Sequence, residues 1–323
     1  MCAWKVNVVM RTQQLGQTGE QVSALCLGAM YFGSRNDKEA SYKILDQYVD
    51  AGGTFIDTAN TYAMWIDGFQ GGESEKLLGE WMAERGNRDD LFIASKVGFD
   101  YQNVPIGLRA HQIEEECNKS LKRMNIDTVD LYYAHKDDRK TPLEETLQAF
   151  DRLISAGKVR FIGASNYLAW RLERAHWMSE ANGWAQYCCV QQRHTYFPLR
   201  PGASSGRQVV ANNDLFEYCS DTGTTLLAYS VLLGGAYTRD DRPLPEGYRC
   251  ADNEQRLAVL RAVANEIGAS PNQVVLCWMM QSSPPVLPLI AASTEAQLAE
   301  NIGALAFELS AEQMRRLNTA GPN

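Results

Sequence analysis

Four polar residues, Asp57, Tyr62, Lys96 and His135, lie at or just beyond the ends of short apolar runs and carry complementary side chains. A tyrosine can protonate a developing alkoxide, but its ordinary pKa of about 10 opposes transfer near neutral pH. A nearby ammonium such as Lys96 favours the phenolate, and Asp57 would keep that ammonium charged. His135 can hydrogen-bond the substrate oxygen and stabilise its charge. The four residues therefore predict a proton relay suited to reducing a carbonyl by hydride.

The apolar runs that carry these residues alternate with stretches of helical spacing. Runs of this kind, bounded by polar residues or glycine, are typical of parallel strands buried on both faces. The expected strands are 22–28, 53–57, 91–96, 129–135, 159–166, 185–191, 224–230 and 285–291. The expected helices between the earlier strands are 38–51, 74–85, 109–124 and 142–156. Eight strand–helix units predict an α/β fold, a closed (β/α)8 TIM barrel.

Local signals refine this expectation. Thr141, Pro142 and Glu144 predict a helix start, with Thr141 as the cap and Pro142 as the first helical residue. The stretch 10–22 predicts an N-terminal β-hairpin that covers the bottom of the barrel, and we also expect an extra C-terminal helix. We expect 1–323 to form a single barrel domain, in which residues 1–9 are either an extension or a misassigned start.

Further polar residues end other expected strands. The carboxyl ends of barrel strands come from distant parts of the chain but surround one pocket, where barrel enzymes place their chemistry. These additional residues are Ser165, Asn166, Gln191, Tyr229 and Ser230. Their repeated occurrence at strand ends predicts that they share a pocket with the first four.

Composition narrows the class of protein. The net charge of −8 over 323 residues argues against a broad nucleic-acid surface, which is normally basic. No signal peptide and no apolar stretch of about 20 residues is found, so we expect a cytoplasmic protein that does not enter a membrane. The eight cysteines show no C-x-x-C spacing, which favours free thiols and no metal site.

Several strings resemble one known family, the aldo-keto reductases, over nearly the whole chain. The family's Asp, Tyr, Lys and His tetrad matches Asp57, Tyr62, Lys96 and His135 in order. The strings at 55–62, 72–79 and 157–166 and the pair Glu300-Asn301 are also similar to the family. The resemblance implies a nicotinamide cofactor bound without a Rossmann fold, and an enzyme that reversibly reduces an aldehyde or ketone, including keto-sugars or secondary-metabolite carbonyls, with Tyr62 as general acid and base.

The resemblance also implies a set of cofactor contacts. Ser165, Asn166 and Gln191 would hold the carboxamide, and the Tyr229 ring would stack on the nicotinamide. The remaining implied positions are Ser230, Leu232 and Gly234 at the pyrophosphate, and Ser293, Gln297, Glu300 and Asn301 at the adenosine end. The string 230–235 departs from the family because proline commonly follows the serine there.

A second departure concerns the choice of cofactor. Relatives that prefer NADPH usually carry Arg or Lys after the eighth strand, because the 2′-phosphate needs cationic partners. The matching stretch 291–297 is neutral except for Glu295. NADP(H) is the family default, but NAD(H) is a serious alternative unless Arg200 or Arg207 supplies the charge from a loop.

The substrate pocket is less defined by the sequence. Five aromatic residues follow expected strands and are candidates to line an apolar mouth: Tyr31, Phe32, Trp65, Phe99 and Tyr196. Each can equally pack beneath a loop. The expected partner is a small carbonyl or alcohol, and the oligomeric state is left open.

The sequence is also compatible with two other functions. The chain could be a regulatory barrel that binds cofactor and a partner with little turnover, with residues 1–9 as a weak candidate for the interaction segment. It could also be a lyase or aldolase that uses Lys96 as a Schiff base, which requires an unprotonated amine. Asp57 would oppose that role by keeping Lys96 charged.

Overall fold

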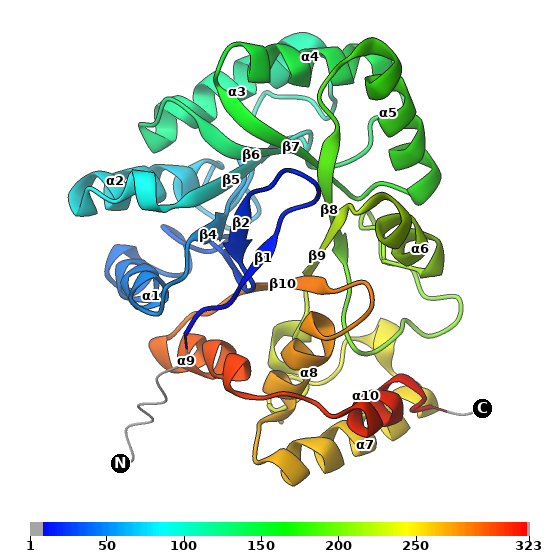
Figure 1. The fold of residues 1–323 in the computed structure, drawn as a ribbon. Coiled ribbons are helices and arrows are strands. Elements are labelled where there is room, and N and C mark those ends of the chain that lie inside the picture. The colour runs from blue at the N-terminus through cyan, green and yellow to red at the C-terminus, as the bar shows by residue number, and fades with distance from the viewer. Residues whose placement is uncertain (1–8, 322–323) are drawn as a thin grey trace.

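The computed structural model describes residues 9–321, and its central feature is a closed barrel of eight parallel strands (Figure 1). The strands follow chain order around the barrel, and the last pairs with the first. They are β3 (Cys26–Gly28), β4 (Phe55–Asp57), β5 (Phe92–Val97), β6 (Val129–Ala134), β7 (Val159–Ser165), β8 (Tyr187–Arg193), β9 (Thr225–Tyr229) and β10 (Val286–Ile290). The predicted (β/α)8 TIM barrel is confirmed.

Helices surround the strands and cover their outer faces (Figure 1). The α-helices are α1 (Lys38–Asp50), α2 (Glu73–Arg85), α3 (Ala110–Met124), α4 (Leu143–Ser155), α5 (Ala169–Asn182), α6 (Asn213–Thr222), α7 (Ala251–Ile267), α8 (Pro271–Met280), α9 (Glu295–Gly303) and α10 (Ala311–Asn318). The 3₁₀ turns are η1 (Arg88–Asp90), η2 (Leu233–Gly235), η3 (Glu246–Tyr248) and η4 (Ala304–Ala306). No helix within 9–321 has both the length and the apolar character needed to cross a membrane.

Alternate strand residues point into the barrel and fill it with apolar side chains, so the interior is a packed core. This inner cluster includes Cys26, Phe55, Phe92, Ala94, Leu131, Tyr133, Cys189, Leu227 and Leu287. The N-terminal hairpin of β1 (Thr12–Gln14) and β2 (Gln21–Ser23) adds Leu15 and Val22, both fully buried, to the same cluster. The predicted hairpin is thus present, and it closes one end of the barrel.

Several expected boundaries differ from the structure by one or two residues, and two differences change how an element or its cap is assigned. The first barrel strand begins at Cys26, because Gln21–Ser23 pairs antiparallel with Thr12–Gln14 in the hairpin. Helix α4 begins at Leu143, with Pro142 in the capping position and no side-chain cap bond. Thr141 is not the cap, since its hydroxyl donates to Asp138 Oδ2 at 2.6 Å. Apart from Val9, the predicted extension 1–9 lies outside the described residues.

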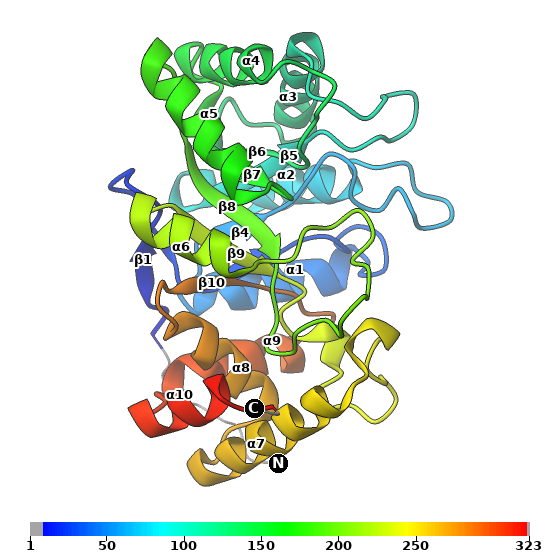
Figure 2. The ribbon, with the colours of Figure 1, turned by 90° about the vertical axis from the view of Figure 1, so that its right-hand side faces the viewer.

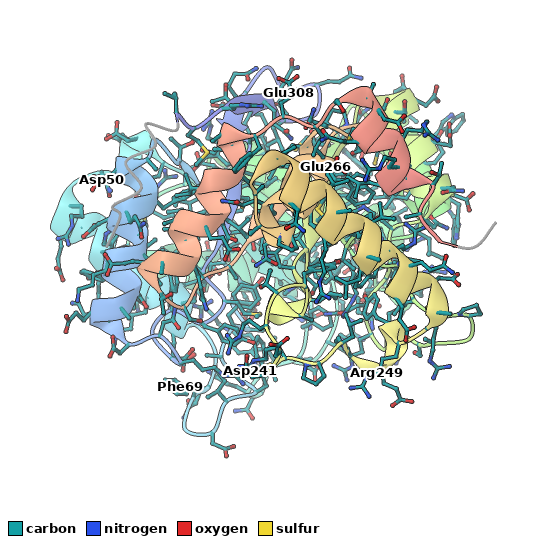
Figure 3. All side chains as sticks on the ribbon, turned by 90° about the horizontal axis from the view of Figure 1, so that it is seen from below. Asp50, Phe69, Asp241, Arg249, Glu266 and Glu308 are labelled. Carbon is teal, nitrogen blue, oxygen red and sulfur yellow. The ribbon has the colours of Figure 1, made fainter. Side chains whose placement is uncertain are left out.

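The two ends of the barrel are clearly different. Figure 2 shows the β1 hairpin on one side and the long loops on the opposite side. Figure 3 shows Phe69, Asp241 and Arg249, which follow β4 and β9, at the end opposite to Asp50 and Glu308. The long loops therefore lie at the carboxyl ends of the strands, and we call that end the mouth.

Candidate active site

The polar residues predicted at the strand ends form a layer above the apolar interior. Side chains along a strand alternate between its two faces, so a residue two positions beyond an inward-facing residue also points inward. The inner-cluster residues Phe55, Ala94, Tyr133, Cys189 and Leu227 are followed at this spacing by Asp57, Lys96, His135, Gln191 and Tyr229. The structure thus brings these side chains to one level at the mouth.

Lys96 is the centre of the hydrogen-bond network. Its Nζ atom donates to the Tyr62 hydroxyl oxygen at 2.8 Å and to the Thr58 carbonyl oxygen at 2.8 Å. It also forms an ion pair with Asp57 Oδ1. Both charged side chains are completely buried. An ammonium with all its donors occupied is held in one position, with one N–H directed at the phenol oxygen.

Asp57 links this network to the neighbouring amide. Its Oδ2 atom accepts a hydrogen bond from Gln191 Nε2 at 2.9 Å, while Oδ1 faces Lys96 and lies 3.4 Å from the Tyr62 hydroxyl. A carboxylate bound on both oxygens has little freedom to rotate. Gln191 therefore helps to fix the orientation of the Asp57–Lys96 pair.

Burial is the largest influence on the pKa values of Tyr62 and Lys96. It raises the pKa of the Tyr62 phenol well above the ordinary value of 10.0, and the negative charge of Asp57 raises that pKa further. This direction is opposite to the effect expected from Lys96 alone, because desolvation and Asp57 outweigh its charge. Burial also lowers the pKa of Lys96, against the opposing effect of Asp57. Tyr62 is therefore protonated at neutral pH and can give up a proton.

His135 lies at the same level, next to the ring of Tyr62. Its ring centroid is 6.1 Å from that of Tyr62 and 4.6 Å from that of Phe99, both edge to face. Burial, reinforced by the charge of Lys96, lowers the pKa of His135 well below 6.5. Its Nδ1 atom is buried and has no hydrogen-bond partner among the described residues. A neutral imidazole in this position can orient a substrate oxygen but cannot supply a proton from an imidazolium.

A buried carboxylate supports the loop that carries Tyr62. Glu116 of α3 accepts hydrogen bonds from Asn60 Nδ2 at 2.9 Å and from the Tyr101 hydroxyl, and it pairs with Lys119. Asn60 lies between Asp57 and Tyr62 in the chain, and Tyr101 follows β5. Glu116 thus joins two loops at the mouth. No local sequence pattern predicts this role, because Glu116 lies among the other polar residues of a helix.

The residues implied at the carboxamide are also brought together. Asn166 has a positive φ of 57°. Its Nδ2 atom donates to the His135 carbonyl oxygen and to Ser165 Oγ, both at 3.0 Å. Its Oδ1 atom accepts from the Tyr229 hydroxyl at 2.8 Å and from Val209 N at 3.0 Å. Adjacent amide and hydroxyl groups beside an aromatic ring fit a flat ligand with a carboxamide.

The implied pyrophosphate loop turns sharply after β9. Ser230, Leu233, Gly234 and Gly235 all have positive φ values, of 59°, 49°, 68° and 95°. Gly234 suits such a backbone because it has no Cβ. Leu232 is half-buried and packs against the core. The loop therefore presents backbone rather than bulky side chains next to Tyr229.

The implied adenosine residues gather at the start of α9, where much of the chain is exposed. Gln297 Oε1 accepts from Ser293 N at 2.8 Å, and Asn301 Nδ2 donates to the Ala291 carbonyl oxygen at 3.1 Å. Glu300 Oε1 accepts from Ser270 Oγ of the α8 cap at 2.6 Å. These bonds stabilise the first turns of α9, and Ser293 is exposed.

The five aromatic candidates for the substrate pocket separate into two groups. Trp65 is 49% exposed and packs edge to face against Tyr62, while Phe99 contacts His135. Tyr31 is half-buried, after β3. Phe32 and Tyr196 are buried in the core, and the Tyr196 hydroxyl donates to the Leu317 carbonyl oxygen at 3.1 Å. The structure brings Trp65 and Phe99, but neither Phe32 nor Tyr196, into contact with catalytic candidates.

The two arginines considered for the 2′-phosphate pair with carboxylates. The Nη1 atom of Arg207 lies 3.1 Å from Asp100 Oδ1, and the Nη2 atom of Arg200 lies 3.6 Å from Glu246 Oε1. Asp100 follows Phe99 in the loop after β5, so Arg207 links two loops at the mouth. Neither pairing places an arginine at the start of α9.

The chain is similar to known proteins over nearly its whole length. The sequence profile described as the Aldo/keto reductase family matches residues 24–321. Norsolorinic acid reductase stcV of Emericella nidulans is 32% identical, with 94% of this chain and 79% of that protein covered. An aryl-alcohol dehydrogenase [NADP(+)] of Phanerodontia chrysosporium is 30% identical, with 94% and 84% covered. A crystal structure of a thermostable aldo-keto reductase in complex with the inhibitor epalrestat matches 97% of this chain and 100% of its own, with TM-score 0.77 and 30% identity.

The closed barrel and the charged layer at its mouth thus define an α/β-barrel oxidoreductase that acts on carbonyls. The chain belongs to the aldo-keto reductase family.

Proposed function

We propose that this enzyme reduces an aldehyde or ketone to the alcohol, reversibly, with hydride from NADH or NADPH and a proton from Tyr62. The observation that carries the proposal is the buried contact set of Lys96, which donates to both Tyr62 and Thr58 and pairs with Asp57. When bound, the nicotinamide supplies the hydride. The protein supplies the proton, the orientation and the charge stabilisation.

Each member of the tetrad has a defined task in this proposal. Tyr62 is protonated and gives its proton to the carbonyl oxygen as negative charge develops there. Lys96 then stabilises the phenolate through its existing hydrogen bond to the phenol oxygen. Asp57 keeps Lys96 charged, and neutral His135 orients the carbonyl. Microscopic reversibility gives the phenolate of Tyr62 the role of base in alcohol oxidation.

The cofactor site is proposed from the chemistry of its residues. The Ser165 hydroxyl and the Asn166 and Gln191 amides match the donors and acceptors of a carboxamide, and the Tyr229 ring supports a flat nicotinamide. The backbone after Ser230 would face the pyrophosphate, and the start of α9 the adenosine. Because that start offers Glu295 and no basic residue between 291 and 297, we propose a weaker NADPH preference than in a relative with Lys or Arg there.

The proposed substrate is an aryl or otherwise apolar carbonyl compound. Trp65 and Phe99 lie beside Tyr62 and His135, so a flat apolar group can pack on their rings while the carbonyl reaches the phenol. One relative is named as an aryl-alcohol dehydrogenase, which agrees with this class. Keto-sugars belong in the test because aromatic faces also bind sugar rings.

A Schiff-base role for Lys96 is disfavoured by its contacts. Its ammonium pairs with Asp57 and donates to two further oxygens, all within the buried layer. An amine must lose its proton to attack a carbonyl. The network therefore suits a fixed cation better than a nucleophile.

The proposed function is tested by oxidation of NADH and NADPH with a panel of aryl aldehydes, ketones, keto-sugars and quinones. Wild type is expected to oxidise cofactor only when a carbonyl is present, and the alcohol product should appear in equal amount. Tyr62→Phe should reduce kcat/KM by about 10²-fold to 10⁴-fold, the usual contribution of a general acid. Full activity of Tyr62→Phe would remove Tyr62 as the acid.

A further inference from the structure

Arg193 places a cation at the mouth, directly above the proposed carboxamide site. It is the last residue of β8 and follows Cys189 and Gln191 at the same alternate spacing. Cys189 belongs to the inner cluster, and Gln191 binds Asp57 inside the barrel. Because side chains at this spacing share a face of the strand, Arg193 also points toward the mouth.

The guanidinium of Arg193 is held by neutral groups alone. Its Nε atom donates to the Tyr248 hydroxyl at 2.9 Å, its Nη1 atom donates to Gln208 Oε1, and its Cζ atom lies 5.5 Å from the centroid of the Tyr248 ring. Tyr248 is buried, and Arg193 is half-buried. Within residues 9–321, its Nη2 atom has no hydrogen-bond acceptor and no carboxylate lies within ion-pair distance of the side chain.

The other arginines of the loops within residues 200–249 are more exposed than Arg193. Arg200, Arg207 and Arg239 each pair with a carboxylate, and Arg242 and Arg249, which have no ion pair within residues 9–321, remain exposed to water. A half-buried cation with no opposite charge is costly, because it has lost water without gaining a counter-charge. A planar guanidinium with free N–H donors is well suited to a phosphate or carboxylate. The arrangement of Arg193 thus resembles a binding site more than a structural ion pair.

The position of this cation relates it to the proposed nicotinamide site. Arg193 is the register partner of Tyr229 on the adjacent strand. Burial raises the pKa of the Tyr229 phenol, and the charge of Arg193 opposes that rise. Gln208, which binds Arg193, precedes Val209, whose backbone N–H donates to Asn166. The guanidinium is therefore linked to the carboxamide site through Gln208 and Val209 on one side, and on the other side Tyr229 is its neighbour in strand register.

We propose that Arg193 binds an oxyanion of a ligand held beside the nicotinamide site. The inference rests on the proposed function, which puts a dinucleotide and a carbonyl substrate at this mouth. Two sources carry such an oxyanion: the nicotinamide-side phosphate of the cofactor and a carboxylate of the substrate. Arg193 recognises the shared chemistry, an oxygen anion that accepts from the Nη2 group.

The first experiment tests the cofactor phosphate by comparing two reduced nicotinamides that differ by one phosphate. Reduced nicotinamide mononucleotide carries the phosphate, and reduced nicotinamide riboside lacks it. If the phosphate is the ligand, Arg193→Gln should raise the Kd for the mononucleotide and for NADH by about tenfold to a hundredfold, the usual range for a charged hydrogen bond, without changing that for the riboside. Arg193→Lys should restore part of the affinity, because it keeps the charge but loses the planar geometry.

The second experiment tests a substrate carboxylate by comparing 4-carboxybenzaldehyde with its methyl ester. If the carboxylate is the ligand, Arg193→Gln should raise KM for the acid by about tenfold or more relative to the ester, with the Kd for NADH unchanged. Arg174→Gln is the matched control, because it removes one positive charge from the exposed face of α5, away from the mouth.

The outcomes separate the inference from the proposed function. If wild type binds and oxidises NADH, but Arg193→Gln behaves as Arg174→Gln does with all five ligands, the inference is wrong and the proposed function stands. If wild type binds none of the reduced nicotinamides, both are wrong. Circular dichroism of each variant identifies any loss of folding. Where Arg193→Gln is unfolded, wild type is compared with the folded Arg193→Lys variant instead.

Discussion

At the scale of single residues, the site separates two groups that could both protonate a carbonyl. Burial raises the pKa of Tyr62, so the phenol holds its proton, and burial lowers the pKa of His135, so the imidazole is neutral. Lys96 donates to the Tyr62 oxygen and can stabilise that oxygen once the proton has left. In the proposed mechanism, Tyr62 is therefore the proton donor and His135 positions the substrate.

These protonation states predict the pH profile. We expect kcat/KM for reduction to vary by less than about twofold between about pH 5.5 and pH 9, because neither Tyr62 nor His135 changes charge there. An inflection near 6.5 that disappears in His135→Gln would contradict this. As the pH falls below 6.5, His135 takes up a proton in the unfolded chain before it does so in the folded chain. The contribution of His135 to the free energy of unfolding is therefore complete above pH 6.5 and is lost progressively at lower pH. Far-UV circular dichroism must therefore accompany the acid points.

At the scale of elements, close helix packing supports the layer of polar residues. Gly79 of α2 lies against the end of α3, and an added Cβ would stand 2.5 Å from the Met124 carbonyl oxygen and 2.7 Å from its Cα. These are backbone atoms, which cannot rotate away as a side chain can. Both helices contribute residues behind the site: Glu75 of α2 binds Ser95, and Glu116 of α3 binds Asn60.

Gly79→Ala should therefore destabilise the protein by about 1 to 3 kcal/mol, despite the better helix propensity of alanine, because α2 and α3 must separate. Urea unfolding measures the change. Lys76→Ala, at an exposed position of the same helix, should stay within about 0.5 kcal/mol of wild type. A Gly79→Ala variant at least as stable as wild type would show that this contact does not limit the packing.

The start of α9 is the element that should set cofactor choice. Glu295→Lys adds a cation where the chain has an exposed carboxylate. The ratio of kcat/KM for NADPH to that for NADH should rise by about tenfold, the effect of a charge-assisted phosphate contact. Glu180→Lys, exposed on α5, makes the same charge change elsewhere and should leave the ratio unchanged. A large NADPH preference in wild type that survives removal of Arg200 or Arg207 would overturn the proposed weak preference.

The elements also show what the sequence can and cannot predict. The strands carrying Asp57, Lys96 and His135 were predictable, because each is a short apolar run that ends in a functional group between two helices. The expected first strand begins too early, since Val22 and Cys26 are both apolar and only the pairing of Val22 with Gln13 assigns Val22 to the hairpin. Contacts between residues far apart in sequence have no such local pattern, as for Glu116 with Asn60.

At the scale of the whole molecule, one closed barrel joins all of these parts. Each strand is hydrogen-bonded to two neighbours, and the apolar interior and the N-terminal hairpin form one cluster. Residues implied at the two ends of the cofactor come from β7 and from α9, which lie far apart in the chain. Bound cofactor would thus stabilise most of the barrel at once.

We expect thermal unfolding in a single transition, with far-UV circular dichroism and tryptophan fluorescence giving the same Tm. NADH at a hundred times its Kd should add about 2.7 kcal/mol and raise Tm by a few degrees. Two separate transitions, only one of them shifted by NADH, would contradict a single barrel domain.

In the proposed reaction, Tyr62 gives the proton and a nicotinamide gives the hydride. The most direct test mixes enzyme loaded with NADH or NADPH with an aryl aldehyde and follows a single turnover of the bound cofactor in wild type and in Tyr62→Phe. We predict that Tyr62→Phe slows this turnover by about 10²-fold or more, while its Kd for the cofactor stays within about threefold of wild type. An unchanged turnover rate in Tyr62→Phe would show that Tyr62 is not the proton donor.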